Sequence, residues 1–253
     1  MVSSTSVETV VKISHFRMDF GKKTVIKDLS FDVKKGEVFG FLGSNGSGKT
    51  TTIRALLGLY QPTSGELLVG GKTFSVSSGI KLGYLPEERG LYKKESVIDV
   101  MTYFGQLKGL SKKEARTSAE AYLSRVKLSD KAMTRIDKLS GGQQQKVQLG
   151  ITIMNNPELL ILDEPTKGFD PVNRRLLMDI IEEHQRNGAT VIFVTHQMEE
   201  VERLCDRIIL LKDGVSYAYG TVAEVKSQYG NASLDDIFLK VYGDENEITE
   251  EAE

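Results

Sequence analysis

A glycine-rich stretch restricts the fold of this chain more than any other feature. Residues 43–50 read GSNGSGKT and fit the pattern G-x-x-x-x-G-K-[ST], whose backbone cradles nucleotide phosphates. The mostly apolar stretch Glu37–Leu42 before it indicates a buried strand, and Thr50–Leu59 after it indicates a helix. A strand, a glycine-rich loop and a helix form one supersecondary unit. The sequence therefore predicts a phosphate-binding loop at a strand-to-helix corner.

The residue types in this loop suit an anion. Glycine adopts positive φ at little cost and has no side chain, so the loop's backbone N–H groups can turn inward. Lys49 adds a full positive charge for the β and γ phosphates, and the Thr50 hydroxyl suits Mg²⁺. A glycine turn without a ligand is the alternative. The expected nucleotide contacts are Gly43, Ser44, Asn45, Gly46, Ser47, Gly48, Lys49, Thr50 and Thr51.

A pair of carboxylates forms the second candidate site. The apolar run Leu159–Leu162 predicts a buried strand that ends in Asp163 and Glu164, at the sheet edge where α/β proteins bind ligands. Alternation along a strand would direct the two side chains oppositely, which gives them different tasks. We expect Asp163 to share Mg²⁺ with Thr50 and Glu164 to orient and deprotonate water. Two solvated strand-end charges are the alternative.

Size and charge exclude several classes of protein. With 253 residues the chain suits one α/β domain, and no linker divides it. A net charge of −2 does not favour a nucleic acid as the main ligand. The apolar runs are far shorter than the roughly 18 residues that span a bilayer, so the chain is not expected to cross a membrane alone. Its beginning lacks a secretory pattern, and the cytosol is the expected compartment. The single cysteine, Cys205, is interpreted as a small buried hydrophobe in preference to a reactive thiol.

The order of predicted elements indicates an α/β fold with three parts. Two strands near the start form a small antiparallel flank, strands with apolar runs on both faces form a mainly parallel sheet, and a helical segment is inserted between them. We expect the flank and nucleotide-binding core at about 8–87 and 155–222, the helical subdomain at about 88–154, and a short C-terminal tail at about 223–253. The acidic run Asp244–Glu247 is predicted to fray in solvent.

The stretch Leu139–Gln143 opens one of the predicted helices. Ser140 suits the N-cap, and Gln143 would close a capping box. Two glycines in the first turn, Gly141 and Gly142, cost helix propensity, roughly 1 kcal/mol each, and a cap alone does not need them. Close approach of a phosphate to this helix end would explain them.

The stretch LSGGQQQK, residues 139–146, resembles the signature motif of the ATP-binding cassette (ABC) family. It lies between the phosphate loop and LLILDEP, in that family's order, and the resemblance extends from about residue 10 to 240. It implies a P-loop (RecA-like) core and head-to-tail dimers, in which each ATP lies between one chain's phosphate loop and the other chain's signature. By this resemblance the partner's ATP would contact Ser140, Gly141, Gly142 and Gln143.

Other roles follow from the same resemblance. Phe20 matches the aromatic residue that stacks on adenine, with Phe16 and a plain core aromatic as alternatives. His196 resembles the switch histidine that contacts the γ phosphate, and Asp170 resembles the loop residue that couples the two sites, although Asp170 before a proline also suits a helix N-cap. Glu87 stands where the family usually has glutamine; a carboxylate still binds Mg²⁺ or water but lacks the amide donor.

The resemblance implies an ATPase subunit that binds two ATP per dimer, closes, hydrolyses them and reopens. A separate membrane permease would do the transport, and the subunit would lie on the inner face of the cell membrane. YLPEERGLYKK, VIDVMTYFGQLKGL and SLDDIFLK are similar to stand-alone cassettes of bacterial exporters. The rival is a cytosolic cassette ATPase that acts on chromosomes or ribosomes, but its usual long coiled-coil insertion or second cassette is not in this sequence. The signature disfavours an unrelated P-loop NTPase.

Overall fold

The computed structural model describes residues 8–75, 79–88 and 90–246. The chain divides into two compact units, each considered by itself. Unit 1 joins the chain up to Gly79 with the chain from Thr190 onward, and unit 2 is Ile80–Ala189. Strands and helices are interspersed along the chain, which confirms the α/β class. The predicted division into core, helical subdomain and tail stays a prediction.

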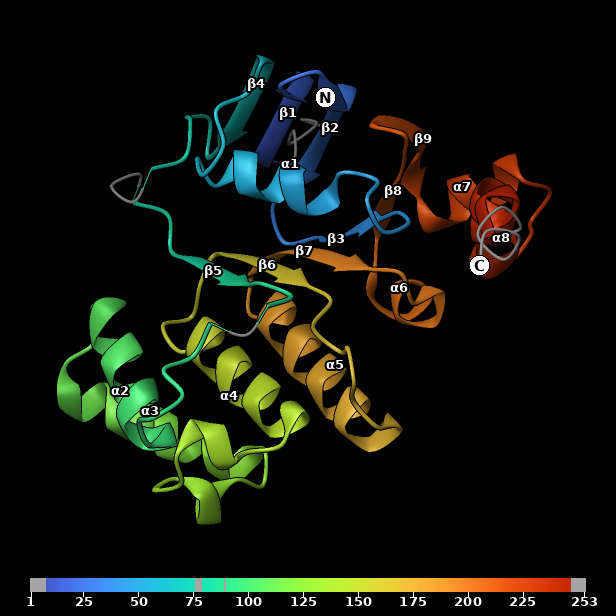
Figure 1. The fold of residues 1–253 in the computed structure, drawn as a ribbon. Helices are drawn as coiled ribbons and strands as arrows, with labels where there is room; N and C mark the ends of the chain where they lie inside the picture. The colour runs from blue at the N-terminus through green and yellow to red at the C-terminus, as the bar shows by residue number, and fades with distance from the viewer. Residues whose placement is uncertain (1–7, 76–78, 89, 247–253) are drawn as a thin grey trace, which may run out of the picture. The chain divides into compact units, whose positions relative to one another are not determined.

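Unit 1 contains the antiparallel flank that the sequence predicted. β1 (Thr9–Phe20) pairs antiparallel with both β2 (Lys23–Lys34) and β4 (Ser64–Val69). Apolar side chains of these strands face the interior, because alternate residues of a strand point to one face. The three strands lie together in Figure 1, with helix α1 (Lys49–Leu56) beside them.

The parallel part of unit 1 is centred on β3 (Val38–Leu42). It pairs in parallel with β7 (Thr190–Thr195) on one side and with β8 (Arg207–Lys212) on the other. Every residue of β3 and β7 is buried, as expected for parallel strands covered on both faces. β9 (Val215–Thr221) returns antiparallel to β8, and the strand order in this unit is β4-β1-β2-β9-β8-β3-β7.

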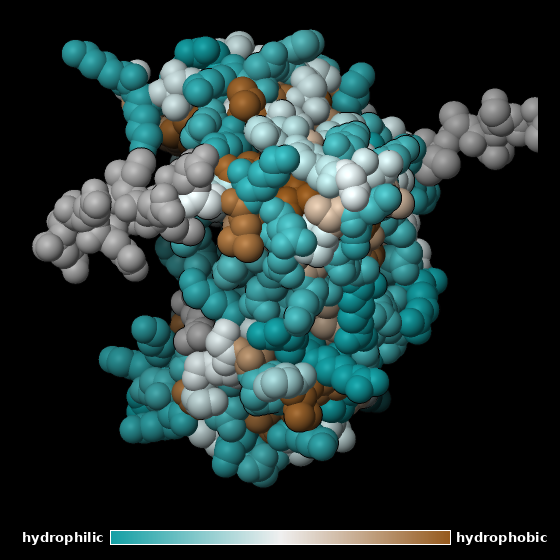
Figure 2. All heavy atoms as spheres, turned by 90° about the vertical axis from the view of Figure 1, so that its right-hand side faces the viewer, coloured by the Kyte–Doolittle hydropathy of each residue, from teal (hydrophilic) through white to brown (hydrophobic). Residues whose placement is uncertain are grey.

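Three further helices of unit 1 follow the strands: α6 (Met198–Leu204), α7 (Val222–Gln228) and α8 (Leu234–Asn246). The prediction of a frayed acidic end is wrong for residues 244–246, which belong to α8, and Glu247 lies outside the described residues. The helix forms because Leu234, Ile237 and Val241 recur at helical spacing and are buried. Figure 2 shows the face toward β9, α7 and α8, where hydrophilic residues cover most of the surface.

Unit 2 consists of two parallel strands and a group of helices. β5 (Leu82–Leu85) pairs with β6 (Leu159–Asp163). The helices are α2 (Val97–Leu107), α3 (Lys112–Arg125), α4 (Gly141–Ile153) and α5 (Pro171–Arg186), with short 3₁₀ turns at Ser129–Lys131 and Ile136–Lys138. Helices α2, α3 and α4 pack against one another. No helix among the described residues is both long and apolar enough to cross a membrane.

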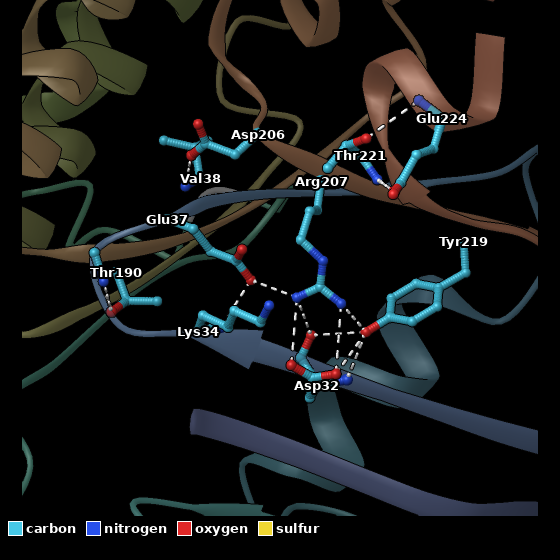
Figure 3. A network of polar contacts seen from close by, with 11 residues as sticks. Asp32, Lys34, Glu37, Val38, Thr190, Asp206, Arg207, Tyr219, Thr221 and Glu224 are labelled. Atoms are coloured by element: carbon cyan, nitrogen blue, oxygen red, sulfur yellow. Dashed lines mark hydrogen bonds and ion pairs between the residues drawn. The ribbon is translucent and has the colours of Figure 1, made fainter. Parts of the chain in front are cut away.

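A network of polar side chains holds the start of β3 in unit 1 (Figure 3). The Arg207 guanidinium lies 3.2 Å from a Glu37 oxygen and 3.3 Å from an Asp32 oxygen, and it also contacts the Tyr219 hydroxyl. That hydroxyl donates to Asp32 at 2.7 Å. The side chains of Arg207 and Glu37 are only 13% and 10% exposed. Burial raises the pKa of Glu37, in opposition to the Lys34 amide and the Arg207 charge.

Arg207→Met should destabilise the protein by about 2–4 kcal/mol, because Glu37 and Asp32 would lose the cation that compensates their partly buried charge. Urea unfolding followed by circular dichroism measures the loss. The deficit should shrink as the pH is lowered, since burial raises the pKa of Glu37 and a protonated Glu37 needs no counter-ion. Arg17→Met, at the more exposed pair with Asp19, is the matched control and should cost much less. Equal losses in the two variants would contradict the role of burial.

Candidate functional site

The phosphate loop follows β3 directly and continues into α1. Gly46 and Gly48 have φ of 81° and 110°, in the region that favours glycine. A Cβ placed on Gly48 would lie 2.3 Å from Cδ1 of the buried Ile26. Glycine at this position is therefore required both by the backbone conformation and by the neighbouring strand.

Lys49 is buried within the loop. Only 8% of the residue is exposed, and its ammonium donates to the carbonyls of Gly43 and Ser44 at 2.7 and 2.9 Å. The hydroxyl of Thr52, one turn along α1, donates to the Gly48 carbonyl at 3.0 Å. These bonds hold the positive charge against the turn that the glycines form.

The loop has the unmet polar groups that a phosphate would satisfy. The Ser47 hydroxyl is buried and has no hydrogen-bond partner among the described residues. Gly48 is the N-cap of α1 and offers no side chain to the first helical amides. Helix N-termini with such amides bind anions, and a buried hydroxyl is costly without a partner. The residues of the loop therefore fit the phosphates of a nucleotide.

Strand register places His196 next to the phosphate loop. β3 and β7 run parallel with Leu42 opposite Thr195, so Gly43 and His196 leave the sheet side by side. His196 is exposed, whereas Thr195 is fully buried and accepts a bond from the Gln197 amide at 3.1 Å. The carboxyl edge of parallel strands is where ligands bind in α/β folds.

The two aromatic candidates for the nucleobase differ in exposure. Phe16 is fully buried in β1 and has no face to offer a ligand. Phe20, at the end of β1, is 44% exposed and contacts the ring of Tyr60 edge-on, with centroids 5.4 Å apart. Burial thus leaves Phe20 as the candidate for adenine stacking.

In unit 2 a second strand edge carries the carboxylates. β5 and β6 run parallel with Leu85 opposite Leu162, so the residues after each strand leave the pair at the same edge. Asp163 is the last residue of β6 and is buried. The backbone then turns, with φ of 48° at Glu164, so strand alternation does not set the direction of this side chain. A left-handed conformation at a residue other than glycine is strained and is often found at functional sites.

Glu87 and Glu164 line one cavity of about 630 Å³ in unit 2. Lys167 also lines it and contacts a Glu87 oxygen at 2.6 Å. The hydrogen bond to Glu87, together with that carboxylate's charge, raises the pKa of Lys167. Sequence analysis missed Lys167, because nothing in the local pattern pairs two residues this far apart. Asp163 is not among the described residues around this cavity.

The helix that begins after Ser140 is capped as predicted. The Ser140 hydroxyl accepts from the Gln143 amide at 3.3 Å, and the Gln143 side chain accepts from the Ser140 amide at 2.9 Å. The capping box is therefore confirmed. At Gly142 an added Cβ would meet only Phe169, at an ordinary 3.5 Å, so the packing of unit 2 does not require glycine there.

Asp170 caps α5, as the proline after it indicated. Its carboxylate accepts from the Asn173 amide at 2.9 Å, and this bond lowers the pKa of Asp170. Phe169 before it is buried. Asp170 is exposed, so its carboxylate can cap α5 and contact another molecule at the same time.

Comparison with known proteins decides the family. The model of the family described as ABC transporter matches residues 26–167, which is more than half of the chain and extends from β2 to the segment after Glu164. The chain belongs to the ABC transporter family. It is an ATP-binding subunit of that family, and the phosphate loop described above lies within the matched region.

Three curated relatives of this ABC subunit are informative. An ABC transporter ATP-binding protein of Methanocaldococcus jannaschii is 45% identical over 85% of this chain and 79% of the relative. The linearmycin resistance ATP-binding protein of Bacillus subtilis is 37% identical over 89% of this chain and 73% of the relative. The Nod factor export ATP-binding protein I of Paraburkholderia xenovorans is 33% identical over 91% and 77%.

A solved structure described as the ATP-binding subunit of an ABC transporter has a TM-score of 0.84 and 28% identity. The match covers 92% of this chain and 99% of the solved chain. It confirms the ABC ATPase type of P-loop fold that the sequence predicted. Among the described residues, no three His, Cys, Asp or Glu side chains are grouped as a metal site.

Gly48→Ala should destabilise the protein by about 2–4 kcal/mol, since it combines a strained backbone with overlap against Ile26. Gly36→Ala is the matched control, because Gly36 also has positive φ (77°) but nothing lies within 4 Å of an added Cβ; about 1 kcal/mol is expected there. Chemical unfolding measures both losses. If both variants lose the same stability, overlap with Ile26 does not shape the loop.

Proposed function

We propose that this subunit hydrolyses ATP and thereby drives a separate membrane permease of an exporter. The observation that carries the proposal is the edge of unit 1, where a glycine loop with a buried lysine and an exposed histidine follow paired parallel strands. A phosphate-binding loop beside a polar group that can sense the terminal phosphate is what coupling of ATP to movement requires.

In unit 1 the loop amides and Lys49 would hold the triphosphate, with the Ser47 hydroxyl as an additional donor. Phe20 would stack on adenine, since its ring is half exposed and aromatic rings stack well on bases. His196 would contact the γ phosphate from its place beside Gly43. These roles rest on the geometry within unit 1 and on the family pattern.

In unit 2 Glu164 would act as the base that orients and deprotonates water. It lines a cavity, and its backbone has a strained left-handed conformation of the kind often found at functional sites. Asp163 and Glu87 are the proposed ligands that unit 2 offers to Mg²⁺, which when bound would neutralise phosphate charge. Lys167 compensates the charge of Glu87, so replacing the family's usual glutamine adds little net charge beside the cavity.

A second cassette, either another copy or a close relative, would complete each ATP site. Gly142 supports this. The packing of unit 2 does not require glycine at this position, and the absence of a side chain allows another molecule to approach the helix tip closely. Ser140, Gly141, Gly142 and Gln143 would then contact the partner's ATP, and Asp170 would couple the two sites. Closure around two ATP and reopening after hydrolysis would deliver the mechanical step.

Export and a permease partner are supported by relatives and by one surface of unit 2. Two relatives are named for Nod factor export and linearmycin resistance. Exposed Tyr92 and Tyr103 contact the ring of Phe104, and exposed Leu107 lies one turn further along α2. Grouped exposed apolar side chains mark protein contacts. The permease would dock here, and the subunit would work at the inner face of the cell membrane. The rival, a cassette ATPase acting on ribosomes or chromosomes, has no such support.

Glu164→Gln should retain ATP binding and lower turnover roughly 10²–10⁴-fold, because the amide cannot accept a proton from water. Phosphate release and ATP binding by calorimetry measure the two effects. Glu158→Gln is the control, since Glu158 precedes the opposite end of β6 and is exposed. Undiminished turnover in Glu164→Gln would assign the base elsewhere. The same variant can be purified from cells in its ATP-bound form. If its partners are lost on nuclease treatment and no membrane protein is purified with it, the rival function on ribosomes or chromosomes is favoured.

Ser140→Arg should leave ATP binding to one subunit intact and prevent the ATP-dependent dimer, because the long side chain would block the partner's phosphates. Ser111→Arg is a matched control, since Ser111 caps α3 with the same box and lies outside the signature. Both variants lose a helix cap worth about 1 kcal/mol, so they should have similar stability and should differ only in ATP-dependent dimer formation. Light scattering with Glu164→Gln and ATP measures it. A dimer formed by the Ser140→Arg protein would exclude the proposed interface.

A further inference from the structure

Phe20 and Tyr60 form an aromatic pair at one corner of unit 1. Their ring planes meet at 83° with centroids 5.4 Å apart, an edge-to-face arrangement that is favourable for aromatic rings. Phe20 ends β1 just before the turn at Gly21, whose φ is 59°. Tyr60 is half-buried and comes four residues after the end of α1. The exposed ring of Phe20 therefore packs against Tyr60, which follows α1.

Tyr60 is in turn held by α1. The Arg54 guanidinium donates to the Tyr60 hydroxyl at 3.2 Å. The chain turns back at Gly58, with φ of 72°, and the Leu59 amide donates to the Arg54 carbonyl at 2.8 Å. Since α1 begins at Lys49, the same short helix carries the phosphate-loop lysine at one end and the support of Phe20 at the other.

Backbone bonds fix the segment after Tyr60 to the end of β1. The Thr63 amide donates to the Arg17 carbonyl at 3.0 Å, and the Asp19 amide donates to the Thr63 hydroxyl at 2.9 Å. The Asp19 carboxylate is held by the Thr24 hydroxyl at 2.6 Å. Polar and aromatic contacts thus join the same two segments, which leaves Phe20 little freedom to move away from Tyr60.

We propose that Tyr60 is a positioning residue for the nucleobase, and that Arg54 holds Tyr60 in place. Tyr60 fixes the plane of Phe20 in advance, so that binding of adenine does not have to order a free ring. The inference rests on the proposed stacking of adenine on Phe20. It adds that α1 sets the distance between the phosphate site and the base site, so a nucleotide is held at both ends by one element.

Tyr60→Ala should raise the dissociation constant for Mg-ADP about 3–10-fold, because the Phe20 ring must then be ordered by the ligand. Binding of inorganic tripolyphosphate, which lacks a base, should stay unchanged. Tyr60→Phe keeps the ring and loses only the bond from Arg54, so its affinity should lie between those of the unchanged protein and Tyr60→Ala. Tyr217→Ala, which removes an exposed tyrosine from β9, is the matched control. Calorimetry measures each constant, and unfolding curves confirm that each variant is folded.

A double-mutant cycle separates this inference from the proposed function. If Tyr60 acts through Phe20, the variant with both Phe20→Ala and Tyr60→Ala should bind Mg-ADP no more weakly than Phe20→Ala alone. Unchanged affinity in Phe20→Ala would remove the proposed adenine stacking itself. Weaker binding in Phe20→Ala but not in Tyr60→Ala would overturn only the role of Tyr60. A parallel loss of tripolyphosphate binding in Tyr60→Ala would also overturn it, since the effect would then pass through the phosphate loop.

Discussion

The parallel pairing of β3 with β7 is the constraint on which the site in unit 1 depends. Parallel strands release the loops that follow them at one edge, and the register of Leu42 with Thr195 sets which residues meet there. A shift by one residue in this pairing would bring other residues to the edge beside the phosphate loop, so the site depends on this register. The same logic holds in unit 2, where Leu85 opposite Leu162 brings the residues after β5 and β6 together.

Buried cations hold both ends of β3. At its start Arg207 neutralises Glu37 and Asp32, and at its end Lys49 donates to the carbonyls of the phosphate loop. Each cation is satisfied by several oxygens, which is the condition for burying charge at acceptable cost. The strand that leads to the phosphate loop is therefore held by polar contacts at both ends, and the glycine turn follows directly from it.

Local signals predicted the helix starts of unit 2 correctly. Ser140 and Asp170 each cap a helix in the way that the sequence indicated, because a cap depends on residues three or four positions apart. Contacts between distant segments could not be predicted in this way. Lys167 contacts Glu87, 80 residues away in the sequence, and Tyr60 contacts Phe20 although two strands and a helix separate them along the chain. The prediction of a frayed acidic end was wrong because the helical spacing of apolar residues in α8 outweighs the effect of its acidic residues.

The sequence by itself determined the family, the phosphate loop and the order of strands and helices. These follow from glycine spacing, apolar periodicity and capping residues, which act over a few positions along the chain. The tertiary structure decided that Phe20 and not Phe16 can offer a face, that His196 stands beside Gly43, and that Glu164 leaves its strand in a strained turn. Burial and register arise only when segments far apart in sequence pack together, so no local pattern contains them.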